Sequence, residues 1–182
     1  MEIPGGNLRG RLDATVLGGG MNNSTYRRLM QVLVDASVDY RVIQHRGEGR
    51  TERASVLRGH ALASAAKCMV VHVRQELENR HVVAVLPGDR RVDYRKLRRE
   101  FGAVDVRMAD RSVAEELTGC QSGCIIPFSF ADDLSVVFDP SLLLPQEVYF
   151  NAARLDRSIG LKPDDLVSLV KPRIADISKA EK

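Results

Sequence analysis

The sequence predicts one domain of the α+β or α/β class, built on a mixed sheet. Candidate strands rich in β-branched residues recur along the chain, and short candidate helices lie between several of them. Other strands are separated only by turn residues such as Pro87-Gly88, which is typical of hairpins. At 182 residues the chain is long enough for one domain with a substantial core. We therefore expect strands of both orientations, packed in layers with helices.

The candidate strands are short apolar runs bounded by turn residues. In chain order they are Tyr40–His45, Cys68–Val73, His81–Leu86, Asp105–Met108, Cys124–Ile126, Leu134–Phe138 and Val148–Ala152. The candidate helices have an apolar face or an end signal. In chain order they are a helix capped by Ser24 with Leu29, Val32, Leu33 and Ala36 on one face, then Arg53–Leu57, Tyr94–Phe101, Ser112–Leu117, and Asp164–Val170 with Pro163 in its first turn.

Capping residues mark the ends of two of these helices. Asp93 is the expected N-terminal cap of the helix that starts at Tyr94, and Gly102 is expected to stop it. Asp110 or Ser112 is expected to cap the next helix. Gly119 then fits the left-handed conformation that ends a helix.

The start of the chain has little structural character, because Gly5-Gly6 and Gly18-Gly19-Gly20 fall within it. We interpret residues 1–20 as a flexible leader or a cloning remnant, with Met21 as the candidate natural start. The domain proper is then expected over residues 21–182. No internal repeat is visible, and nothing after Met21 reads as a linker.

The composition is that of an ordinary globular protein, with 44% hydrophobic and 28% charged residues. No apolar run approaches the ~20 residues that a membrane span needs. The N-terminus also lacks the apolar core of a secretory signal. The sequence therefore predicts a cytoplasmic protein with no membrane partner.

Basic residues gather in one segment, although the net charge is only +3. Residues 89–100 read DRRVDYRKLRRE, with six basic and three acidic residues. A local basic patch attracts phosphates, so this segment is a candidate contact for a nucleic-acid backbone. The alternative is the solvated face of a short helix, and the sequence does not separate the two.

The cysteines and histidines predict neither a disulfide framework nor a metal site. The three cysteines, Cys68, Cys120 and Cys124, do not suggest a framework in a chain of this kind. Cys120 and Cys124 have a spacing that zinc tolerates, but no second Cys/His pair follows at a useful distance. Signatures of phosphate-binding loops, serine hydrolases and zinc proteases are also missing. We expect no metal and no cofactor.

The most distinctive loop of the chain spans residues 118–128. It follows a helix end at Gly119, contains Gly123, which allows close approach of the backbone, and leaves through Pro127. Such a loop can direct bare N–H groups at a ligand, as oxyanion sites do, although the same residues also suit an ordinary turn. Lys67 precedes an apolar strand, where it would point into a cleft toward a carbonyl or phosphate oxygen, or lie exposed at a strand edge.

Several pieces of the sequence occur in a diagnostic order. They are Ala66-Lys67 followed by Met69-Val70-Val71, then VAVLPGD at residues 83–89, then Met108-Ala109-Asp110 leading to Thr118-Gly119, Gly123 and Pro127-Phe128, and finally Val148–Ala153 with Leu161 and Asp165-Leu166. In this order they resemble the YbaK/prolyl-tRNA synthetase-associated editing family, over about residues 29–177. The resemblance implies a YbaK-like fold, with a central mixed, mostly antiparallel sheet that is partly closed and flanked by helices.

Among the branches of that family, the chain is most similar to the YeaK-like stand-alone members. The shared pieces are Thr118–Cys120, Pro127–Phe130, Phe150–Ala152 and Leu155–Ser158. Cys124 and Ala153 depart from the family, because a glycine is usual at both positions. Both departures narrow a backbone-lined pocket, so the identity of the substrate side chain does not follow from the resemblance.

The resemblance implies a free-standing trans-editing aminoacyl-tRNA deacylase. Such an enzyme hydrolyses the ester between a wrong amino acid and the 3′ end of tRNA, with water as the nucleophile and no metal. An activated ester needs only positioning and charge stabilisation. The expected amino acid is small, of the Ala, Ser or Thr type. The alternatives are a non-catalytic tRNA- or synthetase-associated binding module with the same fold, and a protein that acts on another small aminoacyl-like molecule.

The resemblance also assigns roles to individual residues. Lys67 is the expected catalytic residue, which holds the carbonyl or ribose region of the substrate. The expected substrate-binding residues are Gly119, Gly123, Cys124, Ile126, Pro127, Phe128, Asn151 and Ala152. Of these, Ile126, Phe128 and Ala152 are candidate pocket walls or plain core, and Asn151 is a candidate ligand of a substrate hydroxyl or amine, or a turn former at a strand end.

The same family implies the partners. The expected partner is mischarged aminoacyl-tRNA, and a synthetase is a candidate second partner, whereas no DNA partner is expected. Arg90, Arg91 and Arg95 are the candidate contacts for the tRNA backbone, with binding that weakens as salt rises.

Overall fold

The structure is a computed structural model that describes residues 8–9 and 23–181. The predicted leader, residues 1–20, lies outside the described residues apart from Leu8–Arg9. In chain order the elements are β1 (Leu8–Arg9), α1 (Asn23–Asp35), β2 (Tyr40–Gln44), α2 (Thr51–Arg58), the 3₁₀ turn η2 (Leu62–Ser64), β3 (Ala66–Arg74), β4 (Asn79–Pro87), β5 (Arg90–Val92), α3 (Tyr94–Glu100), β6 (Asp105–Met108), α4 (Arg111–Thr118), β7 (Leu134–Phe138), the 3₁₀ turn η3 (Pro140–Leu143), β8 (Val148–Asn151), β9 (Arg157–Leu161), α5 (Pro163–Val170), β10 (Arg173–Ile174) and β11 (Ser178–Ala180).

Most of the strands belong to two sheets. One sheet has the order β1-β2-β9-β8 and is antiparallel throughout. The other has the order β10-β7-β4-β3-β6, in which β3 pairs antiparallel with β4 and β6, while β4–β7 and β7–β10 are parallel. Strands β5 and β11 form a small antiparallel ribbon. The predicted α+β class with mixed, mostly antiparallel pairing is confirmed.

The arrangement of the sheets differs from the expectation of one partly closed sheet. Strand β9 pairs with β2 and β8, β1 pairs with β2, and none of these four strands joins the five-stranded sheet. Both sheets are therefore open, with β1 and β8 as the edge strands of one and β10 and β6 as those of the other. An isolated parallel bridge between Ala65 and Tyr149 is the point at which the beginning of β3 meets β8. This junction is where the candidate site lies.

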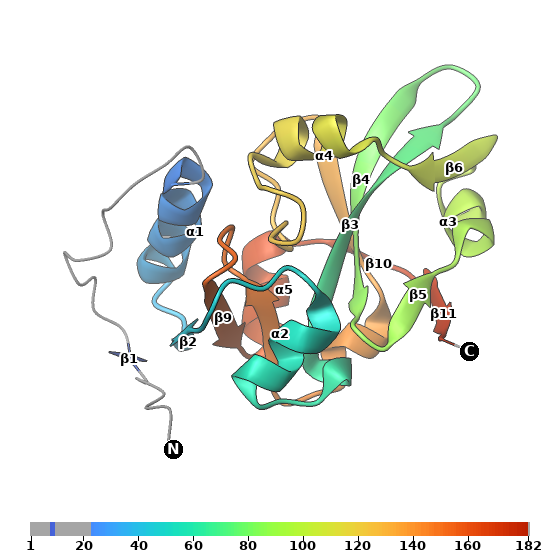
Figure 1. Ribbon diagram of the computed structural model, residues 1–182. Helices are drawn as coiled ribbons and strands as arrows, with labels where there is room; N and C mark the ends of the chain where they lie inside the picture. Colours follow the sequence, from blue (N-terminus) through green and yellow to red (C-terminus); the bar gives the residue numbers. More distant parts are fainter. Residues whose placement is uncertain (1–7, 10–22, 182) are drawn as a thin grey trace.

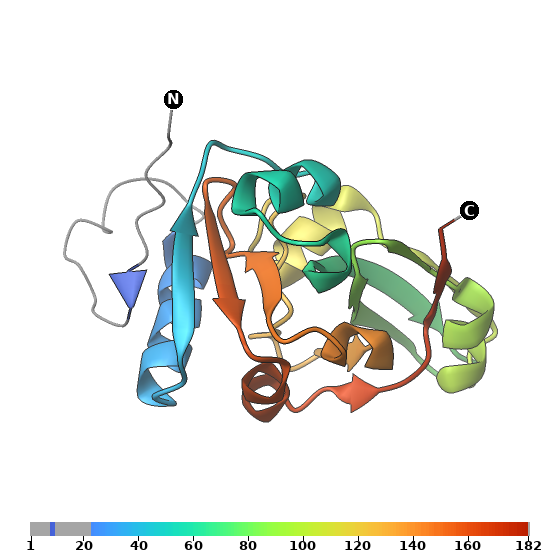
Figure 2. The same ribbon diagram turned by 90° about the horizontal axis from the view of Figure 1, so that it is seen from below.

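Successive side chains of a strand point to opposite sides of a sheet. In the five-stranded sheet, apolar side chains on both faces are buried, each face by a different cluster. One face carries Val70, Val83 and Val85, which pack in the larger core with α1, β8, β9 and α5. The opposite face carries a second set of apolar residues, which packs on α3 and the chain near β11. The members of this second cluster include Val71, Val73, Val82, Ala84, Leu86, Leu97, Phe101 and Ile177. In Figures 1 and 2, α1 lies on one side of the molecule and α3 on the other.

Several helix ends follow from the capping residues. Asp93 accepts hydrogen bonds from the amides of Arg95 and Lys96 at the start of α3, and Gly119 ends α4 with φ of +62°. Three details differ. Ser24, the predicted cap of the first helix, lies inside α1, which begins at Asn23. Asp110 occupies the cap position of α4 without a side-chain hydrogen bond, and Ala36 follows the end of α1 and is exposed.

The predicted strand Cys124–Ile126 is wrong, because these residues form a loop that pairs with no strand. Cys124 and Ile126 are buried with 1% exposure each, so the apolar run reflects packing rather than sheet formation. Among residues 23–181, no helix is long and apolar enough to cross a membrane.

Candidate active site

A small cavity of about 100 Å³ opens where β3, β8, α2 and the loop after α4 come together. Its lining residues come from both sheets and from two loops that are far apart in the sequence. They are Gly49, Thr51, Arg58, Ala66, Lys67, Cys68, Gly123, Ile125 and Asn151. Lys67, Gly123 and Asn151, which the sequence analysis singled out, thus lie around one space.

Lys67 is the second residue of β3, and its side chain is half-buried in the cavity wall. Its Nζ donates a hydrogen bond to the carbonyl oxygen of Gly88, at 3.1 Å. Gly88 has no room for a side chain, because a Cβ there would lie 2.7 Å from the carbonyl oxygen of Leu62. An ammonium has three donors, so this bond fixes the direction of Lys67 and leaves donors for a ligand.

Asn151, at the end of β8, joins two loops across the top of the cavity. Its Nδ2 donates to the carbonyl oxygens of Glu48, at 2.9 Å, and Gly123, at 2.8 Å. Its Oδ1 accepts hydrogen bonds from Arg58 Nη2 and from Ser158 Oγ. Two carbonyl partners can only face an NH₂ group, so the amide orientation is fixed. These four bonds use the full hydrogen-bonding capacity of the side chain.

The two loops that Asn151 holds touch each other through glycines. Gly123 has φ of +93°, and a Cβ built on it would lie 2.9 Å from the Cα of Gly49. Both the backbone conformation and the contact therefore require glycine at this position. The Gly49–Gly123 contact brings the loop before α2 against the loop after α4.

The loop after α4 is anchored by Glu115. Its carboxylate accepts hydrogen bonds from the amide of Ser122, at 2.8 Å, and from Arg111 Nε, at 2.9 Å. These bonds, above all the one from the amide of Ser122, lower the pKa of the partly buried Glu115 carboxyl to about 2. At its start, the loop is also tied to α1, because Thr25 Oγ1 donates to the carbonyl oxygen of Gly119.

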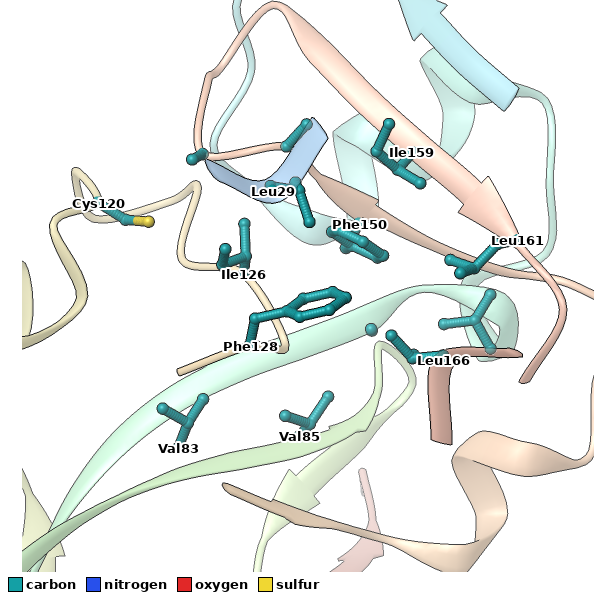
Figure 3. Packing of buried hydrophobic residues seen from close by; sticks show 14 of the residues in the cluster. Leu29, Val83, Val85, Cys120, Ile126, Phe128, Phe150, Ile159, Leu161 and Leu166 are labelled. Atoms are coloured by element: carbon teal, nitrogen blue, oxygen red, sulfur yellow. The ribbon is translucent and has the colours of Figure 1, made fainter. Parts of the chain in front are cut away.

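The other predicted substrate-binding residues do not line the cavity. Gly119 is exposed at the end of α4, whereas the remaining five are buried. The buried five are Cys124, Ile126, Pro127, Phe128 and Ala152. In Figure 3, the ring of Phe128 lies between Phe150 and the pair Val83 and Val85. Of the two readings offered for Ile126, Phe128 and Ala152, the structure places all three in the core.

The three cysteines lie in surroundings that disfavour the thiolate: Cys120 and Cys124 are buried, and Cys68 is partly buried in the cavity wall. Burial raises the pKa of Cys68, and it raises the pKa of Cys120 to about 11 and that of Cys124 to about 12. A thiol with a raised pKa is a poor nucleophile at neutral pH. Within residues 8–9 and 23–181, no group of three or more His, Cys, Asp or Glu residues could hold a metal ion.

The electrostatic character of the cavity is positive. Arg58 and Lys67 both line it, and no carboxylate does. Burial lowers the pKa of His45 and of His60, and the positive charge of Arg58 lowers both further. Neither histidine lines the cavity, and His45 Nε2 lies 2.7 Å from Ser158 Oγ. The two cations, Arg58 and Lys67, therefore line a space suited to a polar or anionic group.

Comparison with known proteins gives this site a family. The sequence profile of the aminoacyl-tRNA editing domain matches residues 45–169, which carry every cavity-lining residue. The chain belongs to this aminoacyl-tRNA editing family. The resemblance inferred from the sequence pieces is thereby confirmed.

Relatives of this editing domain agree with that assignment. The chain is 36% identical over 156 residues to the multifunctional Ser/Thr-tRNA deacylase ProXp-y of Escherichia coli K12, which covers 85% of this chain and 93% of that protein. It is 33% identical over 85 residues to protein YwhH of Bacillus subtilis, over 47% of this chain and 54% of that one.

Solved structures share the fold of the editing domain at lower identity. The hypothetical protein APE2540 superposes with a TM-score of 0.75 at 22% identity, covering 84% of this chain and 99% of that one. A candidate trans-editing enzyme for prolyl-tRNA synthetase gives a TM-score of 0.72 at 22% identity, over 86% and 98% of the two chains.

Six residues that line the editing-domain cavity were not among the site residues predicted from the sequence: Gly49, Thr51, Arg58, Ala66, Cys68 and Ile125. Thr51 and Arg58 are the first and last residues of α2. Nothing local distinguishes Arg58 from the other arginines near it, because its burial depends on the packing of α2 against β8. Ile125 lies between Cys124 and Ile126, which were both predicted to bind substrate. Its place between them in the loop could have identified it as a cavity residue.

The predicted tRNA contacts lie in and after β5, beyond the cavity wall at Gly88. Arg90 Nε donates to Ser178 Oγ at 2.6 Å, and Arg91 lies 3.7 Å from Glu181, so both contact the C-terminal segment. Arg95 is exposed on α3. A shallow surface groove of about 690 Å³ is lined by Arg95 together with Asp93, Lys96, Arg98, Arg99, Gly102 and Ala103.

Proposed function

We propose that this protein is a free-standing trans-editing deacylase, which hydrolyses the ester of mischarged tRNA carrying a small amino acid of the Ser, Thr or Ala type. The main support for this proposal is that Lys67, Gly123 and Asn151 line one small cavity in a chain of the editing family. The relative named as a Ser/Thr-tRNA deacylase supports the same class of substrate. Such a reaction takes place in the cytoplasm, where tRNA is charged.

The volume of the cavity supports a small amino acid. A cavity of about 100 Å³ has room for a group of a few heavy atoms rather than for a large side chain. Thr51 lines this space, and its hydroxyl forms no hydrogen bond with another described residue. A hydroxyl in that place can hydrogen-bond a serine or threonine side chain of the substrate.

In the proposed reaction, Lys67 holds the carbonyl or ribose oxygen of the ester while water attacks the carbonyl carbon. The loop after α4 supplies backbone N–H groups from Gly123 and Ile125. These two residues line the cavity, and their amides form no hydrogen bond with another described residue. Cys124 donates its amide to the carbonyl oxygen of Gln121 and is not available. Positioning and charge stabilisation of this kind suffice for an activated ester.

The buried predicted residues act indirectly in this proposal. Ile126, Pro127, Phe128 and Ala152 anchor the loop and the end of β8 in the core, and Cys124 replaces a glycine next to Gly123. The exposed Arg91 and Arg95 contact the tRNA backbone, and Arg90 orders β5, which carries Arg91 and precedes the helix that carries Arg95. A synthetase remains a candidate partner.

The test is a deacylation assay over a panel of mischarged tRNAs. We expect hydrolysis of Ser-, Thr- or Ala-charged tRNA, and a loss of about 10²–10³ in kcat for Lys67→Ala, because a group that stabilises charge is removed. The matched control is Lys162→Ala, an exposed lysine at the start of α5. Absence of hydrolysis on every tRNA, with tRNA binding retained, would instead support the non-catalytic module.

A further inference from the structure

Arg58 is a largely buried cation at the candidate site with no anionic partner. Its guanidinium lines the cavity, and its Nη2 donates to Asn151 Oδ1. Its Nε is buried and has no hydrogen-bond partner. Among the described residues, no carboxylate lies within ion-pairing distance of Arg58, although other arginines of the chain are paired. A guanidinium has five N–H donors, so most of its binding capacity is open.

A buried charge without a partner is costly, and proteins normally pair such charges or use them to bind a ligand. Burial lowers the pKa of Arg58 to about 10, which still leaves it protonated at neutral pH. Lys67 adds a second positive charge to the same cavity. Of the described residues, Arg58 and Lys67 line the cavity and no carboxylate does, so the cavity favours an anionic group of a ligand.

The guanidinium is also held in place before any ligand arrives. Asn151 Oδ1 accepts a hydrogen bond from the guanidinium. Asn151 is itself held by the bonds from its Nδ2 to the carbonyl oxygens of Glu48 and Gly123 and by the bond from Ser158 Oγ. A donor that is oriented in advance stabilises developing charge without reorganising during the reaction. Asn151 therefore acts here as a positioning residue for Arg58.

We propose that Arg58 is a catalytic residue that, with Lys67, binds the carbonyl oxygen of the scissile ester as it becomes an oxyanion; this rests on the proposed deacylase function. Water forms a bond to the carbonyl carbon, and the π electrons move to the carbonyl oxygen. The bond to the ribose oxygen then breaks, the carbonyl re-forms, and a proton from the water ends on the ribose oxygen. The products are the free amino acid and uncharged tRNA.

The kinetic test compares Arg58→Gln with Arg53→Gln, which removes the same charge from an exposed position of the same helix. Loss of an oxyanion-binding donor lowers kcat by about 10²–10³ and leaves KM nearly unchanged. Arg58→Lys keeps the charge without the planar fork and is expected to retain part of kcat. Arg53→Gln is expected to keep full kcat. Normal kcat in Arg58→Gln would overturn the proposal, and urea unfolding of each variant verifies that it is folded.

A phosphate of the terminal nucleotide is the other source of an anion, and a second substrate distinguishes it. We would compare mischarged tRNA with the matching amino acid ester of adenosine, which has the same ester and no phosphate. An equal kcat defect for Arg58→Gln on both substrates supports the oxyanion. A defect seen only with tRNA, and in KM, would overturn the oxyanion assignment in favour of phosphate binding.

A binding measurement separates this inference from the proposed function. A ligand that binds the folded state raises the thermal unfolding temperature, so inorganic phosphate serves as an anion probe. We expect phosphate to stabilise the wild type and Arg53→Gln more than Arg58→Gln. If this pattern holds while no tRNA is hydrolysed, the deacylase function fails but the anion site stands. Equal stabilisation of all three proteins would show that Arg58 binds no anion.

Discussion

At the scale of the residue, Asn151 shows how a polar side chain in a cavity can serve the structure rather than the ligand. It was expected as a ligand of the substrate or as a turn former, yet all of its donors and acceptors are used within the protein. Its carbonyl partners lie in the loops before α2 and after α4. The side chain is only 7% exposed. It therefore sets the shape of the cavity and the position of Arg58.

Replacing Asn151 by Ala should destabilise the fold and lower activity together. The change leaves two carbonyl oxygens and a guanidinium without their partner, which costs about 1–3 kcal/mol of unfolding free energy. Ser158→Ala is the matched control, since it removes one hydrogen bond to the same oxygen and the contact with His45 Nε2 but leaves the two loop carbonyls and Arg58 bonded to Asn151, and it should cost less. Urea unfolding and the deacylation assay measure both effects. An unchanged stability of Asn151→Ala, with only KM raised, would indicate direct contact with the substrate instead.

The same scale shows what the sequence could and could not predict at the site. Lys67, Gly123 and Asn151 were found because each lies in a motif with a recognisable order. Arg58 was missed because a buried arginine at a helix end has the same local pattern as an exposed one. Its environment depends on β8, nearly a hundred residues later in the chain. Thr51 was missed because its place in the cavity wall likewise depends on segments that are distant in the sequence.

At the scale of the element, helices with caps were predicted well and isolated apolar runs were not. The α3 helix followed from Asp93, and the end of α4 followed from Gly119. The run Cys124–Ile126 was read as a strand, although its side chains enter the core from a loop. Strand β9, Arg157–Leu161, was not predicted, since its sequence contains a glycine and begins with polar residues. Hydrogen bonding to β2 and β8 on its two sides stabilises β9 despite the low strand propensity of its residues.

The contact between the two loops should make Gly123→Ala more harmful than a typical glycine substitution. The new Cβ would lie 2.9 Å from Gly49 Cα, and the φ of +93° is strained for alanine. We expect a loss of about 1–3 kcal/mol in unfolding free energy and a fall in deacylation. Gly102→Ala is the control, because it shares a positive φ, +55°, but meets no atom within 4 Å. Equal losses in both variants would show that the Gly49 contact contributes nothing.

At the scale of the whole molecule, the site exists only where the two sheets meet. Lys67 comes from the five-stranded sheet and Asn151 from the four-stranded sheet, and the Ala65–Tyr149 bridge joins them. The larger core, shown in part in Figure 3, packs both sheets against each other through Val83, Val85, Phe128 and Phe150. The class of the fold could be predicted from apolar strand runs joined partly by turns and partly by short helices, and the mostly antiparallel pairing followed from the family resemblance. The division into two sheets could not, because it depends on contacts between distant strands.

The whole molecule also has a basic segment, residues 90–99, that should guide tRNA. The segment 90–99 lies on β5 and α3, opposite α1 in Figures 1 and 2. Lys96 is paired with Asp176 at 2.7 Å and Arg90 is bonded to Ser178, so these two hold the C-terminal segment. Arg91 faces Glu181 at 3.7 Å with both side chains about half exposed, a weak pair, and Arg95 is exposed. Arg91 and Arg95 are therefore the available phosphate contacts.

Neutralising this surface should weaken tRNA binding in a salt-dependent way. For the double variant Arg91→Gln/Arg95→Gln, we expect lower affinity and a shallower dependence of log K on log salt, by about one unit of slope for each lost phosphate contact. Arg27→Gln, an exposed arginine on α1 at the far side of the molecule, is expected to change neither. Titration of tRNA at several salt concentrations gives both quantities. Arg91 and Arg95 do not line the ester cavity, so hydrolysis of an amino acid ester of adenosine should stay normal in the double variant. An unchanged salt slope with tRNA would exclude this surface as the binding site.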